Sequence, residues 1–212
     1  HSGDAEGAIA AALAVLPNAG QYRPDLIRLL SNLLVEAGRL DEAKNLFEET
    51  LSSKVVPWAK LGLAKVLARQ GSQRQAESML QAAILTHTHY VDAYEELAAL
   101  YMTEGRMEEA MAVYDKCMAI SPNNVTRLQK AGNLANMMGN PGKARQLLER
   151  AVFCGGNSSA LSPETVLQLA LAAKRDGALG DADKYLRMAQ ELARRDDTVI
   201  NRFVGKLASA IF

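Results

Sequence analysis

The side chains with the most reactive chemistry in this sequence are few and scattered. His87 and His89 lie two residues apart in a Thr-His-Thr-His segment, a spacing at which two imidazoles can hold a metal ion, but no third ligand is obvious nearby. Catalysis needs nucleophiles, acids, bases or metals that converge, and the sequence has neither a phosphate-binding glycine loop nor a nucleophile elbow. We therefore predict no metal site, no cofactor and no enzymatic activity, and interpret the histidine segment as a solvated loop.

A second group of side chains is suited to binding rather than reaction. Arg28, Lys65 and Arg69 are expected to form a cationic strip that would take a carboxylate or an acidic helix; the alternative is that they are ordinary solvated residues. Trp58, the single tryptophan, follows Pro57 at the start of an expected helix. It could anchor a ligand or pack against the preceding helices, and we favour packing.

Composition limits the classes of partner. The 24 Lys and Arg residues balance the 24 Asp and Glu residues, which argues against a general nucleic-acid or anionic-membrane binder. No apolar run approaches the roughly 18 residues that a membrane helix needs. Cys117 and Cys154 fall on apolar helix positions, so we expect buried thiols rather than a disulfide framework. A reducing, cytoplasmic compartment is favoured.

The elements that position these residues recur along the chain. In the clearest unit, apolar residues at spacings of three and four predict a helix over residues 91–104. Gly105 breaks that helix, and a second helix over residues 107–119 ends before Pro122. Each unit has a turn glycine and, five residues later, an alanine that lets two helices cross at about 8–10 Å. The pairs are Gly38 and Ala43, Gly71 and Ala76, Gly105 and Ala110, Gly139 and Ala144, and Gly177 and Ala182.

Successive turn glycines are 33, 34, 34 and 38 residues apart. A helix–turn–helix period near 34 is typical of tetratricopeptide repeats, and the chain resembles that family from about residue 24 to 193. The resemblance implies an all-α fold, a right-handed α-solenoid occupying residues 1–212 as one domain. Its expected parts are a half repeat over 3–16 entered by a turn at Gly3 to Glu6, full repeats over 24–53, 57–85, 91–119, 125–153 and 163–193, an insertion at 154–160, and a C-terminal capping helix over 197–212.

In stacked helix pairs the first helices line a concave groove, where partners usually lie. The residues expected to face this groove are Arg28, Asn32, Trp58, Leu61, Lys65, Arg69, Glu95, Met102, Gln129, Asn133, Asn136, Leu167, Lys174 and Arg175.

Tetratricopeptide cochaperones that grip an acidic C-terminus provide one comparison. They use a basic residue and an asparagine on one helix, an asparagine on the next first helix, and Lys and Arg on the third. Arg28 and Asn32 match the opening pair, but Gly62 stands where the next asparagine is needed. Asp92 and Glu96 stand where the bases are needed. These departures from the cochaperone pattern, which we call the clamp pattern, argue against the same mode of binding in this chain.

A narrower resemblance rests on four short motifs. Pro57 to Ala64, Tyr90 to Tyr94, Ser121 to Arg127 and Ser162 to Glu164 are similar, in this order, to bacterial response regulators whose receiver domain precedes tetratricopeptide repeats. The start at His1 without a methionine fits the removal of such an upstream domain. The resemblance implies a non-catalytic scaffold that binds a protein or peptide as the output module of a two-component system.

Two alternatives stay open at this point. One is an assembly factor for envelope or pilus biogenesis that self-associates, for example through its terminal helices. The other is an accessory domain that positions substrate for an enzyme such as a glycosyltransferase.

Overall fold

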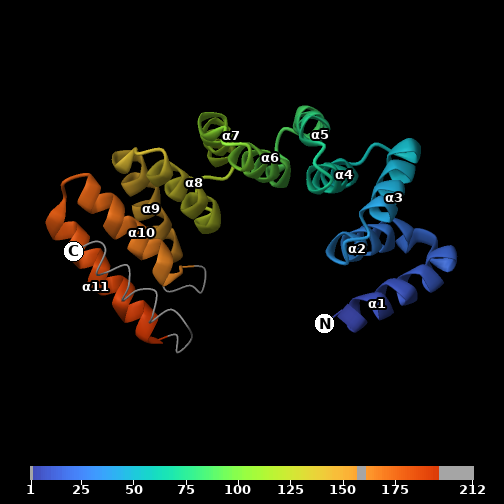
Figure 1. Cartoon of the computed structure of the whole chain (residues 1–212), viewed down its shortest axis with the longest axis horizontal. Coiled ribbons are helices and arrows are strands. Elements are labelled where there is room, and N and C mark those ends of the chain that lie inside the picture. The colour runs from blue at the N-terminus through green and yellow to red at the C-terminus, as the bar shows by residue number, and fades with distance from the viewer. Residues whose placement is uncertain (1, 157–160, 196–212) are drawn as a thin grey trace. The chain divides into compact units, whose positions relative to one another are not determined.

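The computed structural model describes residues 2–156 and 161–195 (Figure 1). Within these two ranges all regular elements are helices, joined mostly by short turns. The chain divides into two compact units, residues 1–105 and residues 106–212, and each is described here by itself.

In unit 1, α1 is followed by two short 3₁₀ turns and then by five helices in succession. Each helix contacts the next, from α1 to α6. In addition α2 contacts α4 and α4 contacts α6, so the first helices of successive hairpins form one inner row. The bounds are α1 Ser2–Val15, 3₁₀ turns Leu16–Asn18 and Gly20–Tyr22, α2 Arg23–Glu36, α3 Leu40–Ser53, α4 Pro57–Arg69, α5 Gln73–Thr86 and α6 Val91–Thr103.

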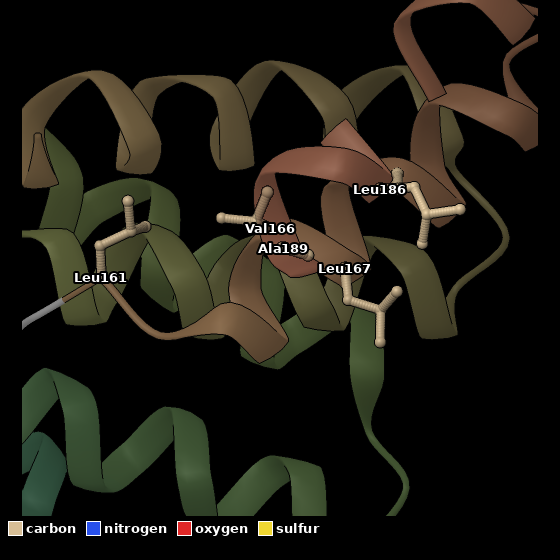
Figure 2. Close-up of a cluster of buried hydrophobic side chains, with 6 residues drawn as sticks. Leu161, Val166, Leu167, Leu186 and Ala189 are labelled. Atoms are coloured by element: carbon tan, nitrogen blue, oxygen red, sulfur yellow. The ribbon is translucent and has the colours of Figure 1, made fainter. Parts of the chain in front are cut away.

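Unit 2 repeats this arrangement, with contacts between consecutive helices and between α8 and α10. Its last described hairpin has a core in which Leu167 of α10 lies beside Leu186 and Ala189 of α11 (Figure 2). Leu167 was expected to face the groove and is instead 2 % exposed, because it lies on the side of α10 that packs against α11. The bounds are α7 Met107–Ile120, α8 Val125–Met137, α9 Pro141–Gly155, α10 Pro163–Arg175 and α11 Leu179–Arg195.

The turn glycines and their alanine partners behave as the sequence predicts. All five glycines have φ between +70° and +83°, the left-handed region that glycine enters without a steric penalty. The five alanines are buried, which allows the close helix crossings. The helix bounds also coincide with the predicted ranges to within a couple of residues.

Two local predictions differ from the structure. The segment from Gly3 to Glu6 is helical rather than a turn, because α1 starts at Ser2 and alanine and glutamate are strong helix formers. Ala8 is accordingly exposed, while Ile9 is buried. In unit 2, α9 runs on to Gly155, into the expected insertion. Residues 157–160 and the expected capping helix over 197–212 lie outside the described residues.

Two further predictions concern thiols and membranes. Cys117 is buried and Cys154 is half-buried, and no disulfide joins them. None of the helices in the described ranges combines the length and the apolarity that crossing a bilayer requires.

Candidate binding groove

Unit 1 contains a hollow of about 490 Å³ between α2, α4 and the start of α6, which we call the central hollow. Five of the residues predicted to face a groove line it together: Arg28, Asn32, Trp58, Leu61 and Lys65. The sequence analysis did not select its other lining residues, which are Asp25, Leu29, Phe47, Gly62, Tyr90 and Asp92.

The floor of the central hollow depends on a close approach between α3 and α4. The ring of Phe47 is 1 % exposed and lies directly against the backbone of Gly62, where a Cβ atom would be 2.2 Å from the ring. Trp58 packs edge-on against Phe47, with ring centroids 6.3 Å apart and an interplanar angle of 63°. Trp58 therefore packs against the preceding repeat and also lines the hollow.

Two further hollows adjoin the central one. The first, of about 660 Å³, shares Arg28, Trp58, Tyr90 and Asp92 with it and extends over the histidine loop between α5 and α6. The second, of about 470 Å³, shares Lys65 with it and lies between α4 and α6. We call the three together the unit 1 groove. The three hollows overlap at these shared residues, and α4 and α6 contribute to each of them.

The three cations of the expected strip all have partners. The guanidinium of Arg28 lies 3.5 Å from a carboxylate oxygen of Asp25, and both side chains are largely exposed. The ammonium of Lys65 lies 3.3 Å from Glu96. The Arg69 guanidinium donates a 2.6 Å hydrogen bond to the backbone carbonyl of Val35 in the last turn of α2. Arg69 thus joins α2 to α4.

The charges of the groove also act on Tyr90. Burial raises the pKa of its phenol above the ordinary value, the carboxylate of Asp92 adds to the rise, and the guanidinium of Arg28 opposes it. The central hollow therefore combines aromatic walls with charges of both signs.

Two predicted residues on α6 do not line any of the three hollows. Glu95 and Met102 are half-buried, and it is Glu96 and Thr103, each one position further on, that line the hollow between α4 and α6. One residue rotates the side chain by about 100° around a helix, so a one-residue offset decides which face it occupies.

The predicted groove residues of unit 2 contribute to bonds between helices. Asn136 is 6 % exposed, and its side-chain nitrogen donates to the backbone oxygen of Gln168 at 3.1 Å. Arg175 donates to the backbone oxygen of Asn136 at 3.4 Å. Asn136 was expected in the groove but is instead buried between α8 and α10. Gln129, Asn133 and Lys174 are half-buried.

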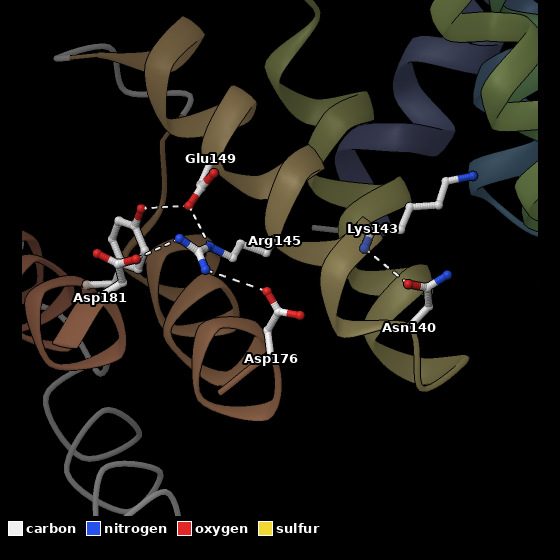
Figure 3. Close-up of polar contacts among 7 residues, drawn as sticks. Asn140, Lys143, Arg145, Glu149, Asp176 and Asp181 are labelled. Atoms are coloured by element: carbon white, nitrogen blue, oxygen red, sulfur yellow. Dashed lines mark hydrogen bonds and ion pairs between the residues drawn. The ribbon is translucent and has the colours of Figure 1, made fainter. Parts of the chain in front are cut away.

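Unit 2 also has a charged cluster that the sequence analysis missed. Arg145 of α9 lies 2.8 Å from Glu149, 3.5 Å from Asp176 and 2.6 Å from Asp181 (Figure 3). Asp176 follows α10 and Asp181 lies in α11, so this one guanidinium joins α9 to the next hairpin. The spacing of four between Arg145 and Glu149 is the available sequence signal.

A tyrosine completes this cluster. The hydroxyl of Tyr185 in α11 donates to Glu149 at 2.9 Å. Burial and the hydrogen bond to Glu149 raise the pKa of Tyr185 to about 12. Partial burial acts to raise the pKa of Glu149, but the hydrogen bonds from Arg145 and Tyr185 lower it on balance.

Hairpins of antiparallel helices whose first helices form an inner row define an α-solenoid. Two sequence profiles described as tetratricopeptide repeat match this chain, over residues 28–73 and 91–124. The repeat period, the hairpins and these matches together show that the chain folds as an α-solenoid of tetratricopeptide repeats.

Solved structures with the same fold share little sequence with it. A tetratricopeptide repeat protein from Parabacteroides merdae superposes with a TM-score of 0.70 at 18% identity, covering 88% of this chain and 71% of that one. MamA from Desulfovibrio magneticus gives a TM-score of 0.67 at 17% identity, with coverage of 82% and 97%. At such identities the likeness concerns the fold alone.

A curated relative is the human protein O-mannosyl-transferase TMTC1, 24% identical over 131 residues. The match covers 61% of this chain but only 14% of the relative, so this chain corresponds to a small part of that protein.

Proposed function

We propose that the chain is a non-catalytic interaction scaffold that holds a segment of a partner protein in the unit 1 groove. The observation that carries this proposal is the overlap of three hollows in unit 1, which share Arg28, Trp58, Tyr90, Asp92 and Lys65. Binding hot spots combine an aromatic or apolar centre with a polar rim. Here the exposed Leu29 and the half-buried Trp58 supply the apolar part.

We further propose, as the narrower role, that this scaffold is the cytoplasmic output module of a bacterial two-component response regulator. Support comes from the four sequence motifs described above. The uncut reading frame tests this role, because a receiver domain with a phosphorylatable aspartate should precede the repeats.

A second candidate is supported by the match to TMTC1. The chain would then be an accessory domain that positions an acceptor segment for a sugar-transferring enzyme. A transferase domain in the same reading frame would favour this role over the first. Both roles use the same groove for binding.

Selection from a phage-displayed library of random peptides tests the binding proposal without knowledge of the partner. Leu29 lines the central hollow and is 53 % exposed, so Leu29→Gln removes apolar contact with little effect on folding. Leu85, 81 % exposed on α5, lines none of the three hollows and provides the matched control Leu85→Gln. Loss of one apolar side-chain contact is worth about 1–2 kcal/mol, or roughly tenfold in affinity.

We expect the selected peptides to bind the wild-type chain and Leu85→Gln equally and Leu29→Gln about tenfold more weakly. Failure to enrich any peptide, or equal binding to both variants, would show that the partner does not lie in this groove.

A further inference from the structure

The charged side chains of the unit 1 groove differ in whether they have a partner within the chain. Each cation has a partner: Arg28 pairs with Asp25, Lys65 pairs with Glu96, and Arg69 donates to a backbone carbonyl. A ligand carboxylate would therefore have to compete with contacts that already exist.

Asp92 is the exception. Its side chain is exposed and lines both the central hollow and the hollow over the histidine loop. Among the described residues it forms no ion pair within 4.0 Å and no side-chain hydrogen bond. Trp58 and Tyr90, both half-buried, line the same two hollows. The carboxylate of Asp92 thus adjoins two aromatic rings, and the cation that lines the same two hollows, Arg28, already pairs with Asp25.

An acidic residue in the first turn of a helix also has a simpler explanation, since it stabilises the helix dipole. Glu108 shows that case: it is the second residue of α7, as Asp92 is the second residue of α6, and it is exposed. Glu108 lines none of the three hollows of unit 1. What distinguishes Asp92 is therefore the cavity and its aromatic walls, not the position in the helix.

We infer that the unit 1 groove takes a basic, apolar segment of a partner protein, with an arginine or lysine side chain on Asp92 and a neighbouring apolar residue on Leu29 and Trp58. This rests on the proposed function and names the chemistry of the segment. The carboxylate supplies charge complementarity. Aromatic faces attract cations further, by about 0.5–1 kcal/mol at exposed sites. The inferred charge is opposite to that expected from the cationic strip.

The test uses the full chain and three short synthetic peptides that differ at one position: Leu-Arg-Leu, Leu-Gln-Leu or Leu-Glu-Leu between identical Gly-Ser flanks. Trp58 is the single tryptophan, so its fluorescence reports binding in this hollow directly. We expect saturable binding in the order Arg, Gln, Glu. An exposed ion pair is worth up to about 1 kcal/mol, so the arginine peptide should bind about three- to fivefold more tightly than the glutamine peptide.

Asp92→Asn should abolish the preference for arginine, while Glu108→Gln, which removes a first-turn carboxylate from the matching position of α7, should leave it unchanged. Far-ultraviolet circular dichroism checks that both variants keep the helicity of the wild type. Added salt should narrow the gap between the arginine and glutamine peptides.

Tighter binding of the glutamate peptide, or an arginine preference that survives Asp92→Asn, would overturn the inference. It would also be overturned if none of the three peptides changed the fluorescence of Trp58 at saturating concentrations. The proposed function fails separately, because it depends on the contrast between Leu29→Gln and Leu85→Gln and not on the sign of the charge. If that contrast holds and the arginine preference is absent, only the present inference is wrong.

Discussion

The unit 1 groove and the Arg145 cluster of unit 2 use the same residue types but match their charges differently. Around Arg145, one guanidinium lies within 4 Å of three carboxylates (Figure 3). Tyr185 donates a further hydrogen bond to Glu149. In the groove, ion pairs are single and exposed, and Asp92 has no ion pair among the described contacts.

This difference distinguishes a cluster that stabilises the fold from a surface that is available for binding. Contacts that connect α9 with α10 and α11 use the charges of unit 2 to hold successive hairpins together. Contacts in the groove leave polar groups accessible at a hollow with aromatic walls. Charged residues at the surface of one solenoid therefore do not have one role, and their partners within the chain indicate which role applies.

The largest effect on stability that tests this comparison is expected at the floor of the groove. Gly62→Ala places a methyl group against the buried ring of Phe47, at 2.2 Å if nothing moves. Overpacking of this severity destabilises a core by up to about 3 kcal/mol. The better helix propensity of alanine offsets about 1 kcal/mol of this loss. We expect a net loss of about 2 kcal/mol, measured by urea unfolding with Trp58 fluorescence as the probe.

Gly7→Ala is the matched control, because Gly7 lies within α1 and a Cβ atom there meets nothing within 4 Å. It should stabilise the chain by about 0.5–1 kcal/mol. If both variants shift the urea midpoint in the same direction, the approach of Gly62 to Phe47 is not tight enough to exclude a methyl group.

The next effect compares the two arginines directly. Arg145→Met leaves Glu149, Asp176 and Asp181 close together without their common cation. The Arg145 side chain is 26 % exposed, so solvent screens these pairs in part; we expect a loss of stability smaller than for a buried ion pair but larger than for a single exposed one. Arg28→Met, which removes a single exposed pair, should stay within about 0.5 kcal/mol.

Urea unfolding followed by circular dichroism measures both arginine variants in the same buffer. The comparison would be contradicted if Arg28→Met cost as much as Arg145→Met, since the cations of the groove would then be structural as well.

The sequence predicted the repeat well because each hairpin is specified locally. Gly105 and its equivalents end the first helices, and alanines such as Ala110 mark the crossings, so period and helix bounds follow from short-range chemistry. Part of the groove was also predictable, because Arg28, Trp58 and Lys65 share the inner faces of first helices.

The features of the groove and of the Arg145 cluster that the sequence did not predict depend on contacts between repeats. Whether Glu95 or Glu96 lines the groove is decided by the rotation of α6, and whether a cation has a partner is decided by side chains on other helices. Asp92 was noted in the sequence only as a departure from the clamp pattern. The three carboxylates around Arg145 come from three separate segments, and only Glu149 has a regular spacing to it.

The smallest expected effect concerns the Arg145 cluster alone and appears at high pH. Tyr185 has its pKa raised to about 12, above the ordinary value of about 10. A raised pKa means that the folded chain holds the phenol proton more tightly than the unfolded chain does. The contribution of Tyr185 to stability is therefore complete below about pH 10 and is lost as the pH rises towards 12.

Ultraviolet absorbance of the phenolate, taken as the difference between wild type and Tyr185→Phe, measures this ionisation. Glu149→Gln removes the negative charge of the carboxylate that accepts the hydrogen bond from Tyr185. The pKa of Tyr185 should therefore move back towards its ordinary value. An unchanged titration in Glu149→Gln would mean that Glu149 does not raise the pKa of Tyr185, and that its hydrogen bond to the tyrosine is not part of the charge matching that distinguishes this cluster from the groove.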